Sequence, residues 1–584
     1  MKIQTFLILA GCASLAATTA TAQTFAVNTT ADTVDANPGD GVAADANGQT
    51  SLRAAVQEAN ALASPGLVRI QLASGMTYTL ALGGAGEDAA ATGDLDVACN
   101  LRIYGAGATV DANSLDRAFD VMPGRSLSVR QLQVRGGCVN GESGGGVRSA
   151  GNLELIDTSI SWSDATGAGA SGGAVFNDGG NLWVNGCTMH DNQASRAGGA
   201  IEANGGFTSL MNSDFDDNAT GPMPGNGGGL HLTGAGSVLV GWCGFHGNSA
   251  AREGGALWNS ATGTMHVEGC YIGDNAATGS AADDGGGGLF NDGGTMTVRD
   301  CEIYGNVATT GSGSGGGLFN NGGYLDVVDC AIDDNVSNRA GGGIEALDGL
   351  TLLTRVWVRN NMTGAMPGNG GGLHLTGAGG VDAFQCVFAE NFASAEGGGM
   401  WNSSGGTMNV HTCLLIDNVA SGDGSDQGGG GLFNAGGTLN VSYSYVIGNV
   451  ADGAAGSGGG VLNDAGWLTM YETSLYANAS NRAGGAVEAN IGQTTITRSV
   501  MIANTTGSSP GNGGGLHLTG AGNVDVADSW IVFNSADNEG GGLWNSATGT
   551  MTVVSTLLFG NLAPVGANAF NDGGTFVLNG NPVP

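Results

Sequence analysis

Three sets of acid–base and aromatic residues recur along the chain, and they are the first candidates for chemistry. Each set holds a glutamate, then a histidine and then a tryptophan, and the spacing within a set is identical in all three. The nine residues are Glu202, His231, Trp258, Glu345, His374, Trp401, Glu488, His517 and Trp544. Carboxylate–imidazole pairs serve general acid–base catalysis, which needs one cleft of unique composition. Because three copies favour a repeated surface over one cleft, we expect ligand binding at these positions and no catalytic residue.

The composition excludes several other kinds of chemistry. Asp and Glu total 51 against 17 Lys and Arg, which gives a net charge of −34. A surface so acidic repels phosphate, so we expect no nucleic-acid or nucleotide partner. Lysine occurs once, at Lys2, so the chain lacks a Schiff-base lysine, a phosphate-loop lysine and the Arg-x-Lys motif of galacturonan hydrolases.

Two groups of residues invite a metal interpretation. Asp32, Asp35, Asn37 and Asp40 could hold Ca²⁺, although their spacing fits an oxygen-rich loop only loosely. Seven cysteines share a fixed place before a recurring asparagine, and none forms a Cys-x-x-Cys pair. They are Cys187, Cys243, Cys270, Cys301, Cys330, Cys386 and Cys413. We expect a buried column of free thiols, no metal site and no other cofactor.

A long repeat organises the sequence. The string Asn-Gly-Gly-Gly-Leu-His-Leu-Thr-Gly begins at Asn226, Asn369 and Asn512, so the interval from the first copy to the second equals that from the second to the third. Within each block a shorter motif ends in asparagine at Asn192, Asn218, Asn248 and onward in the same order. Five short units therefore make one long block, which is present about three times.

Each short unit predicts one coil of a solenoid. In residues 285–306 the apolar side chains alternate within short runs, which indicates strands, and Gly-rich or Asp-Gly segments separate the runs. Three short strands and three turns describe one coil of a parallel β-helix, and only a stack of coils buries its apolar face. We therefore predict an all-β, right-handed, single-stranded parallel β-helix of about 15 coils over residues 136–584.

The phase of the alternation decides where the nine candidate residues point. If Leu230, Leu257 and Leu289 face inward, then His231 and Trp258 face outward and form an aromatic stripe with their neighbours. Such a stripe is either an exposed ligand-binding face or a surface covered by its own Gly-rich loops. An inward face remains the third interpretation if the phase is reversed.

The first residues resemble an export signal. Residues 1–22 combine Lys2, an apolar stretch and a small-residue cleavage site after Ala22. A lipoprotein signal, with Cys12 as the lipidated residue, is the alternative. No later segment has the roughly 18 apolar residues that a membrane-spanning helix needs. We expect a secreted or cell-surface protein.

Two family resemblances follow from the motifs. Gly198-Gly199-Ala200-Ile201 with Phe215-Asp-Asp-Asn218 resembles the repeats of polymorphic outer membrane proteins and autotransporter passengers. Ser51-Leu52-Arg53-Ala54-Ala55 resembles a domain, known by a Cys-Ser-Leu-Arg-Glu-Ala signature, that opens many secreted bacterial β-helix proteins; here Thr50 and Ala54 replace its Cys and Glu. The resemblances imply a β-helix of the pectin-lyase type, without a self-anchoring barrel.

The N-terminal part is expected to close the solenoid. Leu52, Val56, Ala59 and Leu62 share one face of a helix, so residues 23–135 predict a cap with one short helix followed by the first coils. At the other end, Pro582 and Pro584 would blunt an open strand edge, and end-to-end self-association is the alternative.

These observations favour an exported structural or adhesin-like surface protein that presents a repeated face to a glycan or a cell-surface partner. A polysaccharide lyase or glycoside hydrolase on the same scaffold is the alternative.

Overall fold

One coil of the repeat shows how the chain builds the molecule. The strands β21 (Leu230–Thr233), β22 (Ser237–Gly241), β23 (Gly244–His246) and β24 (Ser249–Ala250) follow one another, and the next coil begins at β25 (Leu257–Asn259). Leu230 pairs with Leu257 in parallel register, so each coil lies directly over the previous one. The structure is a computed structural model that describes residues 23–62 and 66–584; the predicted signal, residues 1–22, lies outside them.

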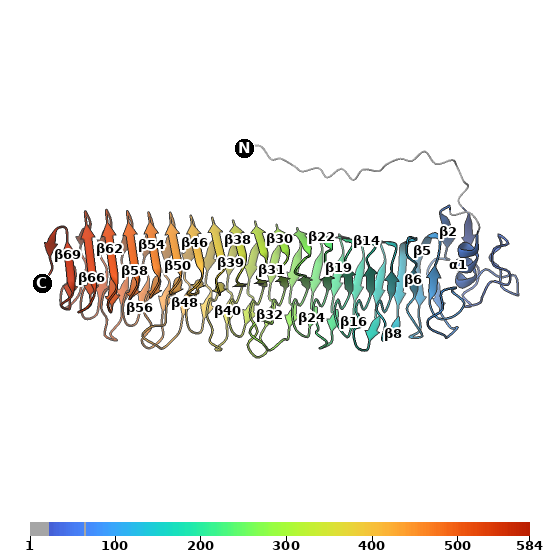
Figure 1. Ribbon diagram of the computed structural model, residues 1–584, viewed down its shortest axis with the longest axis horizontal. Helices are drawn as coiled ribbons and strands as arrows, with labels where there is room; N and C mark the ends of the chain where they lie inside the picture. Colours follow the sequence, from blue (N-terminus) through green and yellow to red (C-terminus); the bar gives the residue numbers. More distant parts are fainter. Residues whose placement is uncertain (1–22, 63–65) are drawn as a thin grey trace, which may run out of the picture.

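The coils form a right-handed parallel β-helix of about 18 turns, as predicted. Three sheets run along it: sheet A with 37 strands, sheet B with 18 and sheet C with 15. Figure 1 shows the coils stacked along one axis, with the helix α1 (Leu52–Ala61) and its loops at the N-terminal end. In the coil above, β21 belongs to sheet B, β22 and β23 to sheet A, and β24 to sheet C.

Each coil contributes four strands, one more than the sequence pattern predicts. The additional strand arises because the segment in sheet A breaks at a single residue in the left-handed region, such as Trp242 (φ 52°) or Asp300 (φ 51°). Two coils place glycine at this position, Gly186 and Gly269, which avoids the strain of a side chain there. The break gives sheet A a bend that runs along the solenoid.

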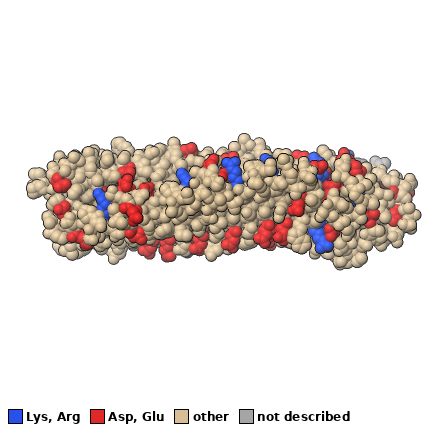
Figure 2. Space-filling view, turned by 90° about the horizontal axis from the view of Figure 1, so that it is seen from below, with Lys and Arg blue, Asp and Glu red and all other residues tan. Residues whose placement is uncertain are grey.

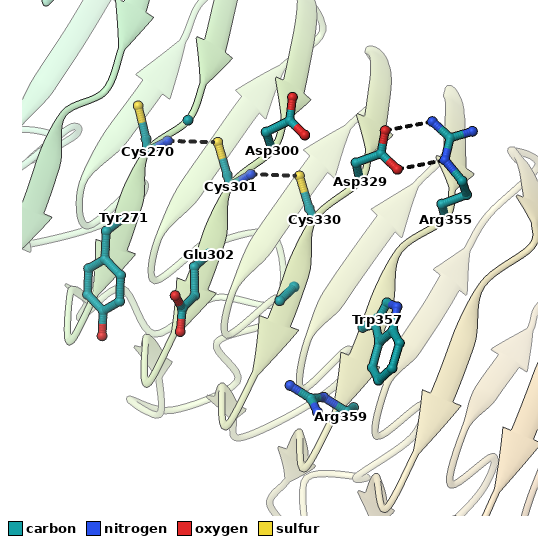
Figure 3. Close-up of a pocket in the computed structure, with 12 residues that line it drawn as sticks. Cys270, Tyr271, Asp300, Cys301, Glu302, Asp329, Cys330, Arg355, Trp357 and Arg359 are labelled. Atoms are coloured by element: carbon teal, nitrogen blue, oxygen red, sulfur yellow. Dashed lines mark hydrogen bonds and ion pairs between the residues drawn. The ribbon is translucent and has the colours of Figure 1, made fainter. Parts of the chain in front are cut away.

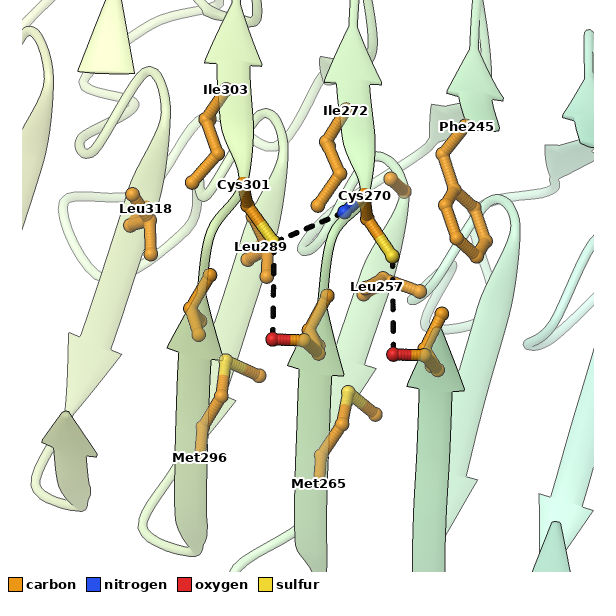
Figure 4. Packing of buried hydrophobic residues seen from close by; sticks show 14 of the residues in the cluster. Phe245, Leu257, Met265, Cys270, Ile272, Leu289, Met296, Cys301, Ile303 and Leu318 are labelled. Atoms are coloured by element: carbon orange, nitrogen blue, oxygen red, sulfur yellow. Dashed lines mark hydrogen bonds between the residues drawn. The ribbon is translucent and has the colours of Figure 1, made fainter. Parts of the chain in front are cut away.

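The core consists of stacked apolar ladders inside the coils. Leu230, Leu257, Leu289 and Leu318 form one such ladder in sheet B, and all four are buried. Figure 4 shows how Met265 and Met296 in sheet A pack toward this ladder. Identical residue types on successive coils let the side chains interlock at the strand spacing of about 4.8 Å.

The predicted thiol column is confirmed. The nine described cysteines are all free, and the seven predicted ones are buried. The backbone N–H of Cys270 donates to Sγ of Cys301 over 3.4 Å, and Sγ of Cys301 in turn donates to the carbonyl of Arg299 over 3.0 Å (Figure 4 shows the first bond). Burial raises the pKa of the Cys187 thiol to about 11, so this group stays protonated. The column therefore satisfies backbone amides at the bend.

The recurring asparagines form a ladder of amides, also as predicted. Oδ1 of Asn306 accepts bonds from the backbone N–H and from Nδ2 of Asn275, both at 3.0 Å. Nδ2 of Asn275 also donates to the carbonyl of Phe245 over 2.9 Å. A second amide ladder in sheet B, with Asn259 bonded to Asn291 over 2.8 Å, was not predicted from the sequence.

The N-terminal cap contains the predicted helix. Leu52, Val56 and Ala59 are buried against the first coils, and Oγ of Ser51 caps the helix by accepting from Ala54 N–H over 2.9 Å. The sequence did not predict the role of Arg53. Its guanidinium is fully buried and pairs with Asp32 at 2.7 Å.

At the C-terminal end sheet A changes direction. β70 (Asn581–Pro582) pairs antiparallel with β69 (Thr575–Leu578), and Val577 lies opposite Pro582. Pro582 has no N–H to offer to a further strand, which is consistent with the expected blunting of this edge.

Candidate functional site

The nine candidate residues lie on one ladder of sheet B. Glu202 pairs with His231, and His231 pairs with Trp258, in parallel register. The ladder continues through Phe290 and Phe319 to Glu345, and then repeats. Their side chains point away from the core leucines, as predicted from the alternation, and Trp258, Phe290 and Phe319 form an apolar cluster separate from the main core.

These side chains are nonetheless covered. Glu202 is 1% exposed, His231 3% and Trp258 8%. The Gly-rich segment before each strand folds over the ladder, and a Cβ at Gly227 would lie 2.8 Å from Cβ of His231. The interpretation as an exposed stripe was therefore wrong, because the loops exclude solvent; the interpretation as a stripe covered by its own loops is confirmed.

Within each set the acid and the imidazole form a buried pair. Nδ1 of His231 lies 2.9 Å from Oε2 of Glu202, and the Thr233 hydroxyl donates to Oε1 of Glu202 over 2.5 Å. Arg196 lies 3.7 Å from the same carboxylate. Burial opposes ionisation of Glu202, but these partners overcome it and lower its pKa. The copies at Glu345 and Glu488 repeat this geometry, with histidine–glutamate distances of 3.0 and 2.9 Å.

The tryptophan completes each set from the next coil. The Trp258 ring stacks on His231 with centroids 4.2 Å apart, and its Nε1 donates to Glu253 over 3.0 Å. Trp401 and Trp544 make the same contacts with Glu396 and Glu539. Burial raises the pKa of Glu253 to about 7, although Trp258 and Arg252 oppose the shift. Each set is thus a closed hydrogen-bonded unit that leaves a ligand little surface to touch.

The residues of the suggested calcium loop bind one another or the backbone. Asp32 pairs with Arg53. Asp35 accepts from Asn37 N–H over 3.0 Å, and Asp40 accepts from Val42 N–H over 2.8 Å. Glu58 of the helix accepts the N–H groups of Gly39 and Gly41 at 2.5 Å each. These bonds fold the loop onto the cap.

A different acidic cluster lies where the cap meets the first coils. Carboxylate oxygens of Asp94, Asp96 and Asp120 lie within 4.8 Å of one another, and all three residues are buried. Burial raises the pKa of Asp94 to about 8 and of Asp96 to about 7. Arg117 pairs with Asp120 at 2.9 Å and with Asp94 at 3.4 Å. A guanidinium among the carboxylates competes with a cation, so the cluster favours a structural role.

An open groove of about 800 Å³ follows the bend of sheet A on its outer face. It crosses β27 (Tyr271–Gly273), β31 (Glu302–Tyr304), β35 (Ala331–Asp333) and β39 (Trp357–Arg359). Its lining includes Tyr271, Asp300, Glu302, Asp329, Arg355 and Trp357. In Figure 3 the side chains of Tyr271 and Glu302 project from neighbouring coils and that of Trp357 projects two coils beyond Glu302, whereas the thiols of Cys270, Cys301 and Cys330 turn away from them. A second hollow, over residues 106–188, follows the same bend toward the N-terminus.

Both arginines of the groove form ion pairs, whereas two of its acidic residues form none with the residues that the structure describes. Arg355 makes two bonds of 2.6 Å to Asp329, and Arg359 pairs with Asp333 at 2.6 Å. The bond from Arg355 lowers the pKa of the Asp329 carboxyl. Asp300 and Glu302 make no ion pair or side-chain hydrogen bond with any residue in the described part of the chain. The groove therefore offers free acceptors beside the exposed ring of Trp357, over which Arg359 lies at 5.2 Å.

Sequence reasoning missed this groove, although a signal for it exists. Each buried cysteine is flanked by two outward residues, as in Asp300-Cys301-Glu302. Alternation about the inward residues places Tyr271, Glu302, Ala331 and Trp357 in one outward row, in that order. What the pattern does not reveal is the bend that hollows the surface there.

In comparisons with known proteins, no family model, no curated protein and no solved structure matches the chain. Among the described residues, no helix has the length and apolarity to cross a membrane.

Proposed function

We propose that the chain is an exported, adhesin-like surface protein whose β-helix presents the groove of sheet A to an uncharged glycan. The observation that carries the proposal is the groove between Tyr271 and Trp357, with the exposed ring of Trp357, the half-buried ring of Tyr271 and free carboxylates. The C–H faces of sugar rings stack on aromatic rings, and their hydroxyls donate to carboxylates. The covered Glu–His–Trp sets belong to sheet B and do not line the groove.

The charge distribution favours an uncharged glycan over an acidic one. Both arginines of the groove are already paired with aspartates, and Asp300 and Glu302 would repel a uronate. The net charge of −34 acts in the same direction. Tyr271 and Trp357 are three coils apart, or about 14 Å at the strand spacing, which suits several sugar units of one chain.

The resemblances are part of the same proposal. The Gly-Gly-Ala-Ile and Phe-x-x-Asn motifs support kinship with the passengers of outer membrane proteins, and the cap motif supports kinship with secreted β-helix proteins. Export through residues 1–22, with cleavage after Ala22 or lipidation of Cys12, belongs to this proposal as well.

The groove is tested by replacing one aromatic ring. Titration of neutral oligosaccharides into the protein, followed by calorimetry, should give binding that Trp357→Ala weakens about tenfold, because a stacked ring contributes about 0.5–1.5 kcal/mol beyond the area that it buries. Glu302→Gln should weaken it less. The matched control is Trp467→Ala, whose ring is 66% exposed but lies outside the groove. Equal loss in Trp357→Ala and Trp467→Ala would refute the site.

A carbohydrate-active enzyme remains the second candidate, because Asp300, Glu302 and Asp329 share one groove. Glycoside hydrolysis uses two carboxylates on either side of the bond that breaks. Asp329 is held ionised by Arg355, as a base or nucleophile requires. Release of reducing ends from a bound glycan, abolished by Asp329→Asn with binding retained, would favour the enzyme and set aside the adhesin.

A further inference from the structure

A band of uncharged side chains lies on the outer face of sheet A in the C-terminal part of the solenoid. It is formed by the first and third residues of seven short strands. These strands are β43 (Val387–Ala389), β47 (Leu414–Ile416), β51 (Tyr445–Ile447), β55 (Ser474–Tyr476), β59 (Val500–Ile502), β63 (Trp530–Val532) and β67 (Leu557–Phe559). The middle residue of each strand points into the core. We call these fourteen outward residues the apolar band.

The apolar band differs sharply from the same positions nearer the N-terminus. None of its residues is charged, and every one except Ser474 is aliphatic or aromatic. The equivalent positions of earlier coils carry Asp214, Asp216, Glu302, Asp333 and Arg359. The change of character begins after Arg359, within an otherwise regular repeat. The backbone is the same in both parts, so the difference lies only in the types of the outward residues.

Large parts of the apolar band are open to solvent. Tyr445 is 56% exposed, Trp530 58%, Leu557 50% and Phe559 59%. The strands beneath are paired on both sides along most of the band, so their backbone groups are satisfied within the sheet. A partner therefore has to be held by side chains, and burial of apolar area is the interaction these side chains offer.

We propose that the apolar band is the contact through which two copies of this chain associate side by side. A copy related by a two-fold axis presents the same band, so the surface is complementary to itself. The charge of the molecule limits where two copies can meet. Figure 2 shows acidic side chains over one long face with few basic ones among them, and two rods of net charge −34 repel each other except where both are uncharged.

Other occupants fit the apolar band less well. A glycan needs hydrogen-bonding groups, and the band offers a serine and the hydroxyls of its tyrosines. A bilayer surface attracts proteins through Lys and Arg beside the apolar face; the band holds neither, and Arg498 beside it is paired with Glu472. A second copy stacked on the C-terminal end would have to pair with the antiparallel strand β70, in which Pro582 offers no N–H.

The size of the apolar band sets the expected affinity. Seven strands span about 29 Å, and each strand with its flanking positions, which include Glu472, Arg498 and Asp528, spans about 16 Å. The projected area is therefore about 450 Å² per copy, or about 900 Å² in total, which is the range of weak, transient interfaces. We expect a reversible dimer with a dissociation constant in the micromolar range.

Sedimentation velocity from about 1 to about 200 µM tests this proposal on the full mature chain. The parent should shift from monomer to dimer, and Trp530→Asp and Leu557→Asp should each stay monomeric. Trp467→Asp is the matched control: its exposed ring lies on the same sheet, in β54 (Trp467–Tyr471), but outside the apolar band, and it should dimerise like the parent. Circular dichroism checks that each variant is folded.

Salt separates an apolar contact from a charged one. Raising the salt concentration screens the repulsion between the two acidic rods, so dimerisation should strengthen. A parent that stays monomeric at all concentrations would overturn the proposal. So would dimers that persist in both Asp variants, dimers that dissociate on adding salt, or a monomer that floats with neutral phosphatidylcholine vesicles.

Discussion

At the scale of single residues, many ionisable side chains of this protein bond to other residues of the same chain. Glu202 contacts His231 and accepts from Thr233 beneath a loop, and Trp258 stacks on the imidazole ring and donates to Glu253. Arg53 is buried with Asp32 as its counter-ion. Residue types that elsewhere do acid–base chemistry thus pin loops to the solenoid here. The residues left free to meet a ligand are those around the bend of sheet A.

The carboxyl of Glu253 makes stability depend on pH. Its pKa rises from 4.5 to about 7 because burial disfavours the charge. A folded-state pKa above the unfolded value stabilises the protein fully below about pH 4.5, and this contribution is lost as the pH rises through about 7. Glu253→Gln cannot ionise but still accepts from Nε1 of Trp258. We expect denaturant unfolding to show the variant about 2–3 kcal/mol more stable than the parent at pH 8, with no difference at pH 4.

The control for this prediction is Glu268→Gln, at an exposed position of β26 (Thr264–Glu268). It should leave the difference between the two pH values unchanged. If Glu253→Gln loses stability at pH 8, the carboxylate is ionised and bonded there, contrary to the burial argument.

At the scale of elements, features that recur in every coil could be predicted from the sequence, whereas loop paths and bends could not. The thiol column and the asparagine ladder could be predicted because each recurs at a fixed place in every unit. The helix α1 could be predicted from the spacing of Leu52, Val56 and Ala59. The loop cover over His231 could not, because it depends on the path of Gly-rich segments, whose sequence fits many turns. The bend at Trp242 was missed for a related reason: one left-handed residue breaks a strand without changing its alternation.

The asparagine ladder should contribute strongly to stability. Asn306 is fully buried, accepts two bonds from Asn275 and donates to the carbonyl of Ile272 over 2.9 Å. Asn306→Ala leaves these groups without partners inside the solenoid, at a cost of about 2–4 kcal/mol. Thermal unfolding by circular dichroism measures the loss. Asn409→Ala, which removes an asparagine on the outer face of sheet A, is the control and should cost less than about 0.5 kcal/mol. Equal losses would show that the ladder is not a source of stability.

At the scale of the whole molecule, the long repeat makes the solenoid modular. Each coil contacts the coils before and after it, so the sum of local contacts sets the stability of the stack. The outward residues therefore differ from one part of the solenoid to another, while the core ladders stay the same. The groove with Asp300 and Glu302 lies in the middle of the solenoid, whereas the apolar band covers the coils after Arg359. The two proposed binding surfaces can therefore be tested independently on one scaffold.

Modularity predicts that one whole block can be removed. Deleting residues 226–368 joins Gly225 to Asn369, which stands where Asn226 stood, so Glu202 meets His374 in place of His231 and every ladder continues in register. We expect a folded solenoid five coils shorter, and at the strand spacing this reduces its length by about 24 Å. Small-angle X-ray scattering measures the length, and circular dichroism the retained β structure. Deleting half of this block, which sets unlike residues over one another, should unfold the protein or cause aggregation. If the shorter deletion folds as well as the full one, the ladders do not enforce register and the modular account fails.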